Sequence, residues 1–159
     1  MNQAQLRSYL STPEVSELIF MEPPNIRTAL IEGRFPPPDI LLGNKKGWEA
    51  QRIRDFGIWA GHIDNNGARL TPARGRKWDV KRYEPDMWSV STEMFYSLLG
   101  IAKLAGTYRQ AITELHWHQF LPAPDVRLGD MLGWSEAKAD EIARKWDEGG
   151  AQAFVRSQL

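Results

Sequence analysis

Apolar residues recur at helical spacing in two separate parts of the chain. The first part has Val15, Leu18 and Ile19, and the second has Leu98, Ile101, Leu104 and Ala105. Side chains three and four residues apart share one face of a helix, so each set predicts an amphipathic helix with that face buried. Ser11 precedes Thr12-Pro13-Glu14, and a serine cap followed by proline and an acidic first turn predicts where the first helix begins.

A second helix is predicted after each of these, following a short break. The breaks are Met21-Glu22-Pro23-Pro24 in the first part and Gly106-Thr107 in the second. Because proline suits the first turn of a helix but not its interior, we expect a new helix near Asn25–Glu32. After the glycine-containing break of the second part, we expect one near Arg109–Trp117. The residues expected to face inward are Ile26, Leu30 and Ile112.

Each second helix is followed by a proline-rich segment, which must run extended. Short hairpins are then predicted, beginning at Ile40–Leu42 and at Val126–Leu128, each with a glycine-containing turn. A last helix is expected over Glu49–Trp59 and over Ser135–Trp146, with Ser135 as its N-cap. The order helix, tight turn, helix, hairpin, helix is that of a winged helix-turn-helix.

The two parts are copies of one sequence unit at a constant offset of 86 residues. Pro38–Trp48 lies over Pro124–Trp134, and six of the eleven paired residues are identical. Trp48 and Trp134 are expected to lie in the core of each copy. The sequence therefore predicts an α+β fold, mostly helical, made of two tandem winged helix-turn-helix units related by this repeat. The predicted units cover residues 8–60 and 95–150, joined by a basic, partly structured connector over residues 61–94.

Charge is unevenly distributed, although the formal net charge of the chain is zero. Residues 61–83 carry six basic side chains against two acidic ones, whereas residues 84–159 carry seven against eleven. A local excess of basic residues favours contact with phosphate. The connector residues that could make such contacts are Arg74, Arg76, Lys77, Lys81 and Arg82.

Composition and motifs narrow the class of protein further. The chain has no cysteine, which excludes disulfides, thiol catalysis and cysteine-based zinc sites. It lacks an apolar run of the roughly 18 residues that a membrane span needs, and it lacks a signal-peptide core. No phosphate-binding glycine loop or catalytic triad is recognisable, and His116 and His118 point to different faces of a helix. We therefore expect a cytoplasmic, nucleoid-associated protein that is not an enzyme and has no cofactor or metal.

Longer motifs carry a resemblance to a known family. The first copy has Gly33-Arg34-Phe35-Pro36-Pro37-Pro38, then Leu42-Gly43 and Trp48, and the second has Leu104-Ala105-Gly106-Thr107-Tyr108-Arg109, then Pro122-Ala123-Pro124, Leu128-Gly129 and Trp134. Both copies resemble the winged helix-turn-helix of the AlpA and excisionase-type family, which is related to the MerR DNA-binding domain. The chain departs from the family pattern at Glu22-Pro23, at Gln119 and at the turn Asp130-Met131-Leu132.

The resemblance implies that the second helix of each copy enters the major groove of DNA and that the hairpin contacts the backbone. The candidate DNA contacts of the first copy are then Asn25, Arg27, Thr28, Arg34, Lys45 and Lys46. Those of the second copy are Tyr108, Arg109, Gln110, Thr113, Glu114 and Arg127. The acidic turn makes the second copy the weaker DNA binder, or a surface for packing or protein contacts.

The expected function is sequence-specific binding of double-stranded DNA by a transcriptional regulator of a phage, plasmid or other mobile element. The resemblance also allows an excisionase-like architectural recombination factor. A further alternative is a protein-interaction adaptor with little affinity for DNA, whose second copy binds another protein or the chain itself. No membrane partner is expected.

Overall fold

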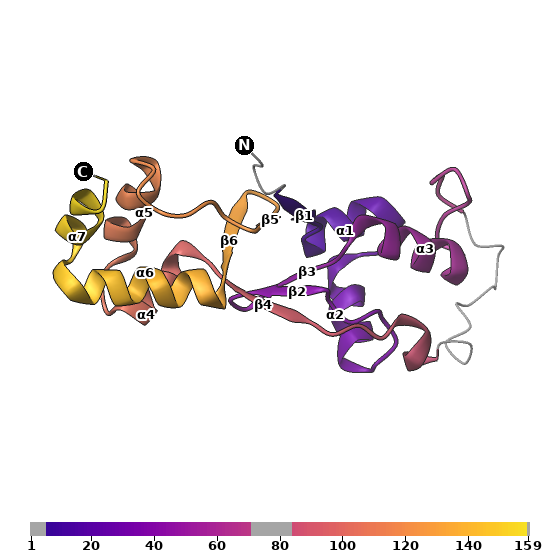
Figure 1. Ribbon diagram of the computed structural model, residues 1–159. Helices are drawn as coiled ribbons and strands as arrows, with labels where there is room; N and C mark the ends of the chain where they lie inside the picture. Colours follow the sequence, from indigo (N-terminus) through magenta and orange to yellow (C-terminus); the bar gives the residue numbers. More distant parts are fainter. Residues whose placement is uncertain (1–5, 71–83, 159) are drawn as a thin grey trace. The chain divides into compact units, whose positions relative to one another are not determined.

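The computed structural model describes residues 6–70 and 84–158 (Figure 1). The candidate connector residues Arg74, Arg76, Lys77, Lys81 and Arg82 lie outside the described residues. The first copy contains β1 (Arg7–Tyr9), α1 (Thr12–Ile19), α2 (Pro23–Ile31), β2 (Ile40–Leu42), β3 (Lys45–Gly47) and α3 (Ala50–Ala60). The 3₁₀ helix η2 (Pro85–Trp88) precedes the second copy, which contains β4 (Glu93–Tyr96), α4 (Leu98–Ala105), α5 (Arg109–Trp117), β5 (Val126–Leu128), β6 (Met131–Ser135), α6 (Glu136–Gly149) and α7 (Ala151–Arg156).

The elements of the two copies recur at the offset of the sequence repeat. Adding 86 to the bounds of α1, α2 and β2 gives the bounds of α4, α5 and β5. The tryptophan contacts recur as well, since the indole Nε1 of Trp48 donates to the carbonyl of Pro36 and that of Trp134 donates to Pro122, both at 2.8 Å. Both tryptophans are fully buried, as predicted.

Side-chain caps determine where the helices begin. The Ser11 hydroxyl accepts from the backbone N–H of Glu14, and the Glu14 carboxylate accepts from the N–H of Ser11 at 3.1 Å, which completes a capping box at the start of α1. The Ser97 hydroxyl accepts from the N–H of Gly100 at the start of α4, and the Ser135 hydroxyl accepts from the N–H of Lys138 at the start of α6. The predicted caps Ser11 and Ser135 are confirmed.

The prediction of two separate winged helix-turn-helix units is wrong. The six strands form one hydrogen-bonded sheet in the order β1-β5-β6-β4-β2-β3. The N–H of Arg7 in β1 donates to the carbonyl of Asp125 at 3.2 Å, and the N–H of Glu93 in β4 donates to Asp39 at 3.0 Å. The leading strand of each copy thus bonds to the hairpin of the other copy, and β4 also pairs with β6 of its own copy. Backbone groups at a hairpin edge need partners, and these leading strands supply them.

The two compact bodies of the chain do not coincide with the two sequence copies. The amino-terminal body comprises the described residues of 9–41 and 45–93, and the carboxy-terminal body comprises the described residues of 94–159 together with 42–44 and the start of β1. Gly43 belongs to the carboxy-terminal body, and its N–H donates to the carbonyl of Phe95 at 3.3 Å. The hairpin of the first copy is therefore part of the sheet and not a free wing.

Each body has its own apolar core. The amino-terminal core is formed by Val15, Ile19, Met21, Ile26, Ala29, Phe35, Trp48, Ile53, Phe56 and Ile63. The carboxy-terminal core is formed by Ile101, Ala102, Ile112, Leu115, Trp134, Ala139, Ile142 and Phe154. Phe154 comes from α7, a helix that the sequence pattern did not predict. Leu104 was expected to face inward, but it is 44% exposed because α4 packs through Ile101 and Ala102 instead.

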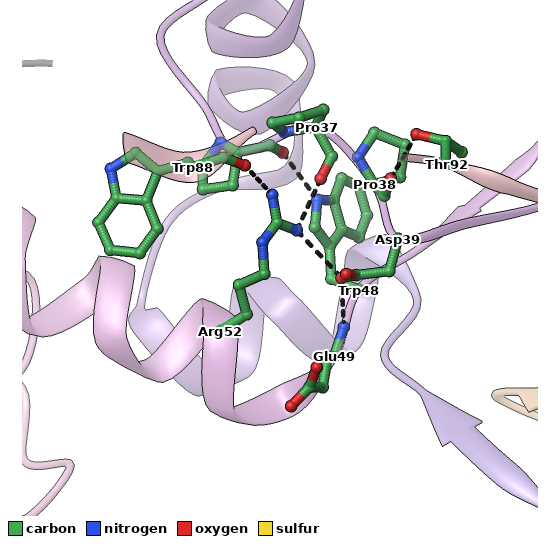
Figure 2. Close-up of polar contacts among 9 residues, drawn as sticks. Pro37, Pro38, Asp39, Trp48, Glu49, Arg52, Trp88 and Thr92 are labelled. Atoms are coloured by element: carbon green, nitrogen blue, oxygen red, sulfur yellow. Dashed lines mark hydrogen bonds and ion pairs between the residues drawn. The ribbon is translucent and has the colours of Figure 1, made fainter. Parts of the chain in front are cut away.

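Arg52 in α3 ties together the parts of the amino-terminal body that lead into β4 (Figure 2). Its guanidinium donates to the carbonyl of Pro37 at 2.8 Å, to the Asp39 carboxylate at 3.0 Å and to the carbonyl of Trp88. The Thr92 hydroxyl adds a bond to the carbonyl of Pro38 at 2.7 Å. The segment before β4 is therefore held against the hairpin of the first copy.

Within the described part of the chain, no helix is both long and apolar enough to cross a membrane.

Candidate nucleic-acid interface

Helix α2 has one buried face and one polar face. A turn of three residues, 20–22, separates it from α1. Ile26 and Ala29 point into the core, whereas Asn25, Arg27 and Thr28 are exposed. Asn25 and Thr28 are three residues apart and are neighbours on the helix surface, whereas Arg27 is two residues from Asn25 and points to a different side of the helix. The structure therefore exposes Asn25 and Arg27 near the start of α2 but does not place them on one face.

The threonine candidates are partly occupied by their own helices. The Thr28 hydroxyl donates to the carbonyl of Pro24 at 3.0 Å, and the Thr113 hydroxyl donates to Arg109 at 2.8 Å. A hydroxyl has one donor, so each threonine offers only an acceptor and a methyl group outward. Either can contact a thymine methyl but neither is a ready donor.

Arg34 follows α2 and differs from the other cationic candidates. Its Nε donates to the Glu32 carboxylate at 2.6 Å, and its Nη2 forms an ion pair with the same oxygen. The guanidinium is partly buried, so its charge is largely compensated by Glu32. Arg34 is therefore a weaker candidate for phosphate than a solvated cation would be.

Lys45 and Lys46 lie on β3 in the same body as α2, and both are exposed. Neither takes part in an ion pair with any other described residue. The structure therefore leaves both ammonium groups to solvent, where they can contact phosphate. They belong to β3, the last strand in the order of the sheet, rather than to the tip of a free hairpin.

The second copy presents a different surface. Ile112 and Leu115 of α5 are buried, while Arg109 and Gln110 are exposed and Thr113 is half-buried. Arg127 is the exposed residue of β5. Tyr108, at the N-cap of α5, is 83% exposed.

The last residue of each second helix is apolar and exposed. Trp117 closes α5 at 79% exposure, and Ile31, its counterpart at the repeat offset, closes α2 at 87%. Sequence analysis did not single out either residue. Comparing the two copies position by position for apolar residues outside the buried face could have found them.

A hollow of about 390 Å³ lies beside the start of α2 in the amino-terminal body. It is lined by Phe20, Met21, Glu22, Asn25, Thr28, Arg34, His62 and Arg69. The Arg69 guanidinium lies over the Phe20 ring, with 5.7 Å between its central carbon and the ring centroid. Burial lowers the pKa of His62, because desolvation disfavours the imidazolium, so this residue is neutral near pH 7.

Phe20 and His62 were not predicted from the sequence, and Arg69 was noted only as one of the six basic residues of 61–83. His62 and Arg69 follow α3 in a short loop closed by a bridge between Ile63 and Arg69. The only sequence signal is the breaker Asn65-Asn66-Gly67 between them. In the part of the chain that the structure describes, no three His, Cys, Asp or Glu residues gather as a metal site would require.

Comparison of the chain with protein-family models, with curated proteins and with solved structures finds no match. The resemblance to the AlpA and excisionase-type family stays a prediction.

Proposed function

We propose that the protein binds double-stranded DNA with α2 in the major groove and acts as a sequence-specific regulator. The observation that carries the proposal is the surface of α2, where Asn25 and Arg27 are exposed and Ile26 and Ala29 are buried. The helix has nine residues and is about 14 Å long. With its side chains an α-helix is about 10–12 Å across, which a major groove about 12 Å wide admits.

The exposed residues have the chemistry that this role needs. An asparagine amide pairs with the two polar atoms of an adenine edge, and an arginine guanidinium pairs with those of guanine. Lys45 and Lys46 supply cations for the phosphate backbone, which fixes register without reading bases. Arg109 and Gln110 place similar chemistry on α5. Regulation of a mobile element and an excisionase-like role both begin with this binding step.

The test starts with selection of bound sequences from a random duplex pool by the intact protein. The affinity for the recovered duplex is then measured for wild type, Arg27→Ala and Lys45→Ala/Lys46→Ala. We expect Arg27→Ala to weaken binding about 5- to 150-fold, since a bidentate base contact is worth about 1–3 kcal/mol, and to relax selection at one position. The double lysine variant should weaken binding to every duplex alike. Arg54→Ala is the matched control, because it removes an exposed charge from α3.

An adaptor role is the second candidate, and the exposure of Tyr108 and Trp117 on the second copy favours it. The same measurements separate the two roles. A DNA-binding protein loses affinity steeply as salt is raised, with a log–log slope near −0.9 per neutralised phosphate. If no sequence is enriched and no salt-dependent binding is measured, the DNA proposal is wrong.

A further inference from the structure

Phe20 is in a backbone conformation that phenylalanine rarely adopts. It caps α1 with φ 57° and ψ 41°, in the left-handed region. The second copy has Gly106 at the equivalent position, with φ 72°. A side chain larger than glycine is strained there, and residual strain of this kind often marks a functional position. Burial does not explain the aromatic ring, because Phe20 is 46% exposed.

The ring of Phe20 supports Arg69. The guanidinium lies over the ring face at 5.7 Å, a contact that leaves the N–H groups at its edge able to donate. The nearby Asp64 carboxylate is engaged by its own turn, where it accepts from the N–H of Asn66 at 2.8 Å and of Ala68 at 2.9 Å. Among the described residues no carboxylate forms an ion pair with Arg69.

The polar residues that line this hollow are not repeated at the offset of the second copy. At the repeat offset, Phe20, Asn25, Arg34 and Arg69 become Gly106, Ala111, Phe120 and Val155. Two guanidinium groups and an amide are thus replaced by apolar groups at the matching positions of the sequence. The polar lining therefore belongs to the copy whose second helix carries Asn25 and Arg27.

We propose that this hollow binds a phosphate group, with Arg69 as the donor and Phe20 as the residue that positions it. This inference rests on the proposed function, and the phosphate it names is a DNA phosphodiester next to the groove that α2 enters. A guanidinium donates two parallel hydrogen bonds to phosphate oxygens. Glu22 is the one acidic side chain lining the hollow, so it opposes the anion.

The experiment measures affinity for the selected duplex and for a random duplex between 50 and 200 mM salt, for wild type and Arg69→Ala. We expect Arg69→Ala to weaken both complexes by a similar factor and to reduce the log–log slope by about 0.9, the value for one phosphate. Arg54→Ala, the matched control, should leave the slope unchanged. Glu22→Gln should strengthen binding, because it removes the opposing charge.

The positioning role of Phe20 is tested by substitutions that keep or remove its aromatic ring. Phe20→Tyr keeps the aromatic face and should retain the wild-type slope, whereas Phe20→Leu should approach the slope of Arg69→Ala. An unchanged slope in Arg69→Ala would overturn the proposal. If Arg27→Ala still weakened binding in that case, DNA recognition by α2 would stand without the hollow.

A titration with inorganic phosphate, followed by NMR at the Arg69 Nε–H, covers the other source of phosphate. Saturable shifts at the guanidinium that are absent in Arg69→Ala, with no slope change on DNA, would assign the hollow to free phosphate and overturn the DNA assignment. Shifts together with the slope change support a DNA phosphate. The titration needs no DNA binding, so it also tests the hollow if the proposed function fails. Absence of both the phosphate-induced shifts and the slope change overturns the inference.

Discussion

Replacement of Gln119 by glycine is expected to stabilise the protein, because Gln119 adopts a backbone conformation that glycine reaches without strain. Gln119 has φ 61°, and Gly33, its counterpart in the first copy, has φ 69°. The surrounding backbone bonds are also equivalent. The N–H of Gln119 donates to His116 at 3.0 Å, and that of Gly33 donates to Leu30 at 3.1 Å. The two positions therefore differ in side chain and not in local structure.

The magnitude follows from two opposing terms. A non-glycine residue in the left-handed region costs about 1–2 kcal/mol, whereas glycine loses about 0.4–1 kcal/mol more backbone entropy on folding. Gln119 is exposed, so its removal sacrifices little burial. The net gain for Gln119→Gly is about 1 kcal/mol. In a chain of this size that gain corresponds to a rise of about 2–4 °C in the midpoint of thermal unfolding.

The reverse change provides the matched control. An added Cβ at Gly33 has no heavy atom within 4 Å, so Gly33→Ala tests backbone strain without a steric clash. We expect it to lower the free energy of unfolding by about 1 kcal/mol. Both variants are compared with wild type by urea unfolding followed through tryptophan fluorescence, with calorimetry for the midpoint. A midpoint for Gln119→Gly at or below that of wild type would refute the argument.

Two further substitutions test packing and charge. Gly133→Ala should destabilise the protein by about 1–3 kcal/mol, because the new Cβ would lie 2.7 Å from Val126 and 2.8 Å from Leu42; unchanged urea unfolding would contradict this. Asp125 is desolvated by burial, which raises its pKa, but bonds from Ser135 and Lys138 outweigh this and lower it below 3.8. A carboxylate whose pKa is lower in the folded state than in the unfolded state stabilises the fold at pH values above the unfolded pKa. That stabilisation is lost as the pH falls through the folded-state pKa. The stability deficit of Asp125→Asn at pH 7 should therefore shrink below pH 3.8, and a constant deficit would exclude the carboxylate charge as its cause.

For most helices, residues close in the chain were sufficient to predict where the helix begins and which face is buried. Ser11 and Glu14 form a capping box, and Ser135 caps α6, so these starts are encoded within one turn of the chain. Trp48 and Trp134 were correctly placed in the cores. Helix ends and buried faces depend on neighbours three or four residues away, and a single sequence contains those neighbours.

The candidate site was predictable only in part. The exposed residues of α2, Asn25 and Arg27, follow from helical spacing around Ile26. The ion pair of Arg34 with Glu32 and the stacking of Arg69 on Phe20 do not. Phe20 and Arg69 are 49 residues apart, and nothing in the pattern between them indicates that the loop after α3 returns to the end of α1.

Local sequence was enough to predict most of the helices, the caps Ser11 and Ser135, and the repeat, because each depends on residues close in the chain or on direct comparison of the copies. The bonds of each leading strand to the hairpin of the other copy were not predictable in this way and are known from the tertiary structure alone. The bonds from Arg7 to Asp125 and from Glu93 to Asp39 join backbone groups, which are the same in every residue except proline. Strands of three and four residues show too little alternation to predict, so their partners are selected by long-range pairing and packing.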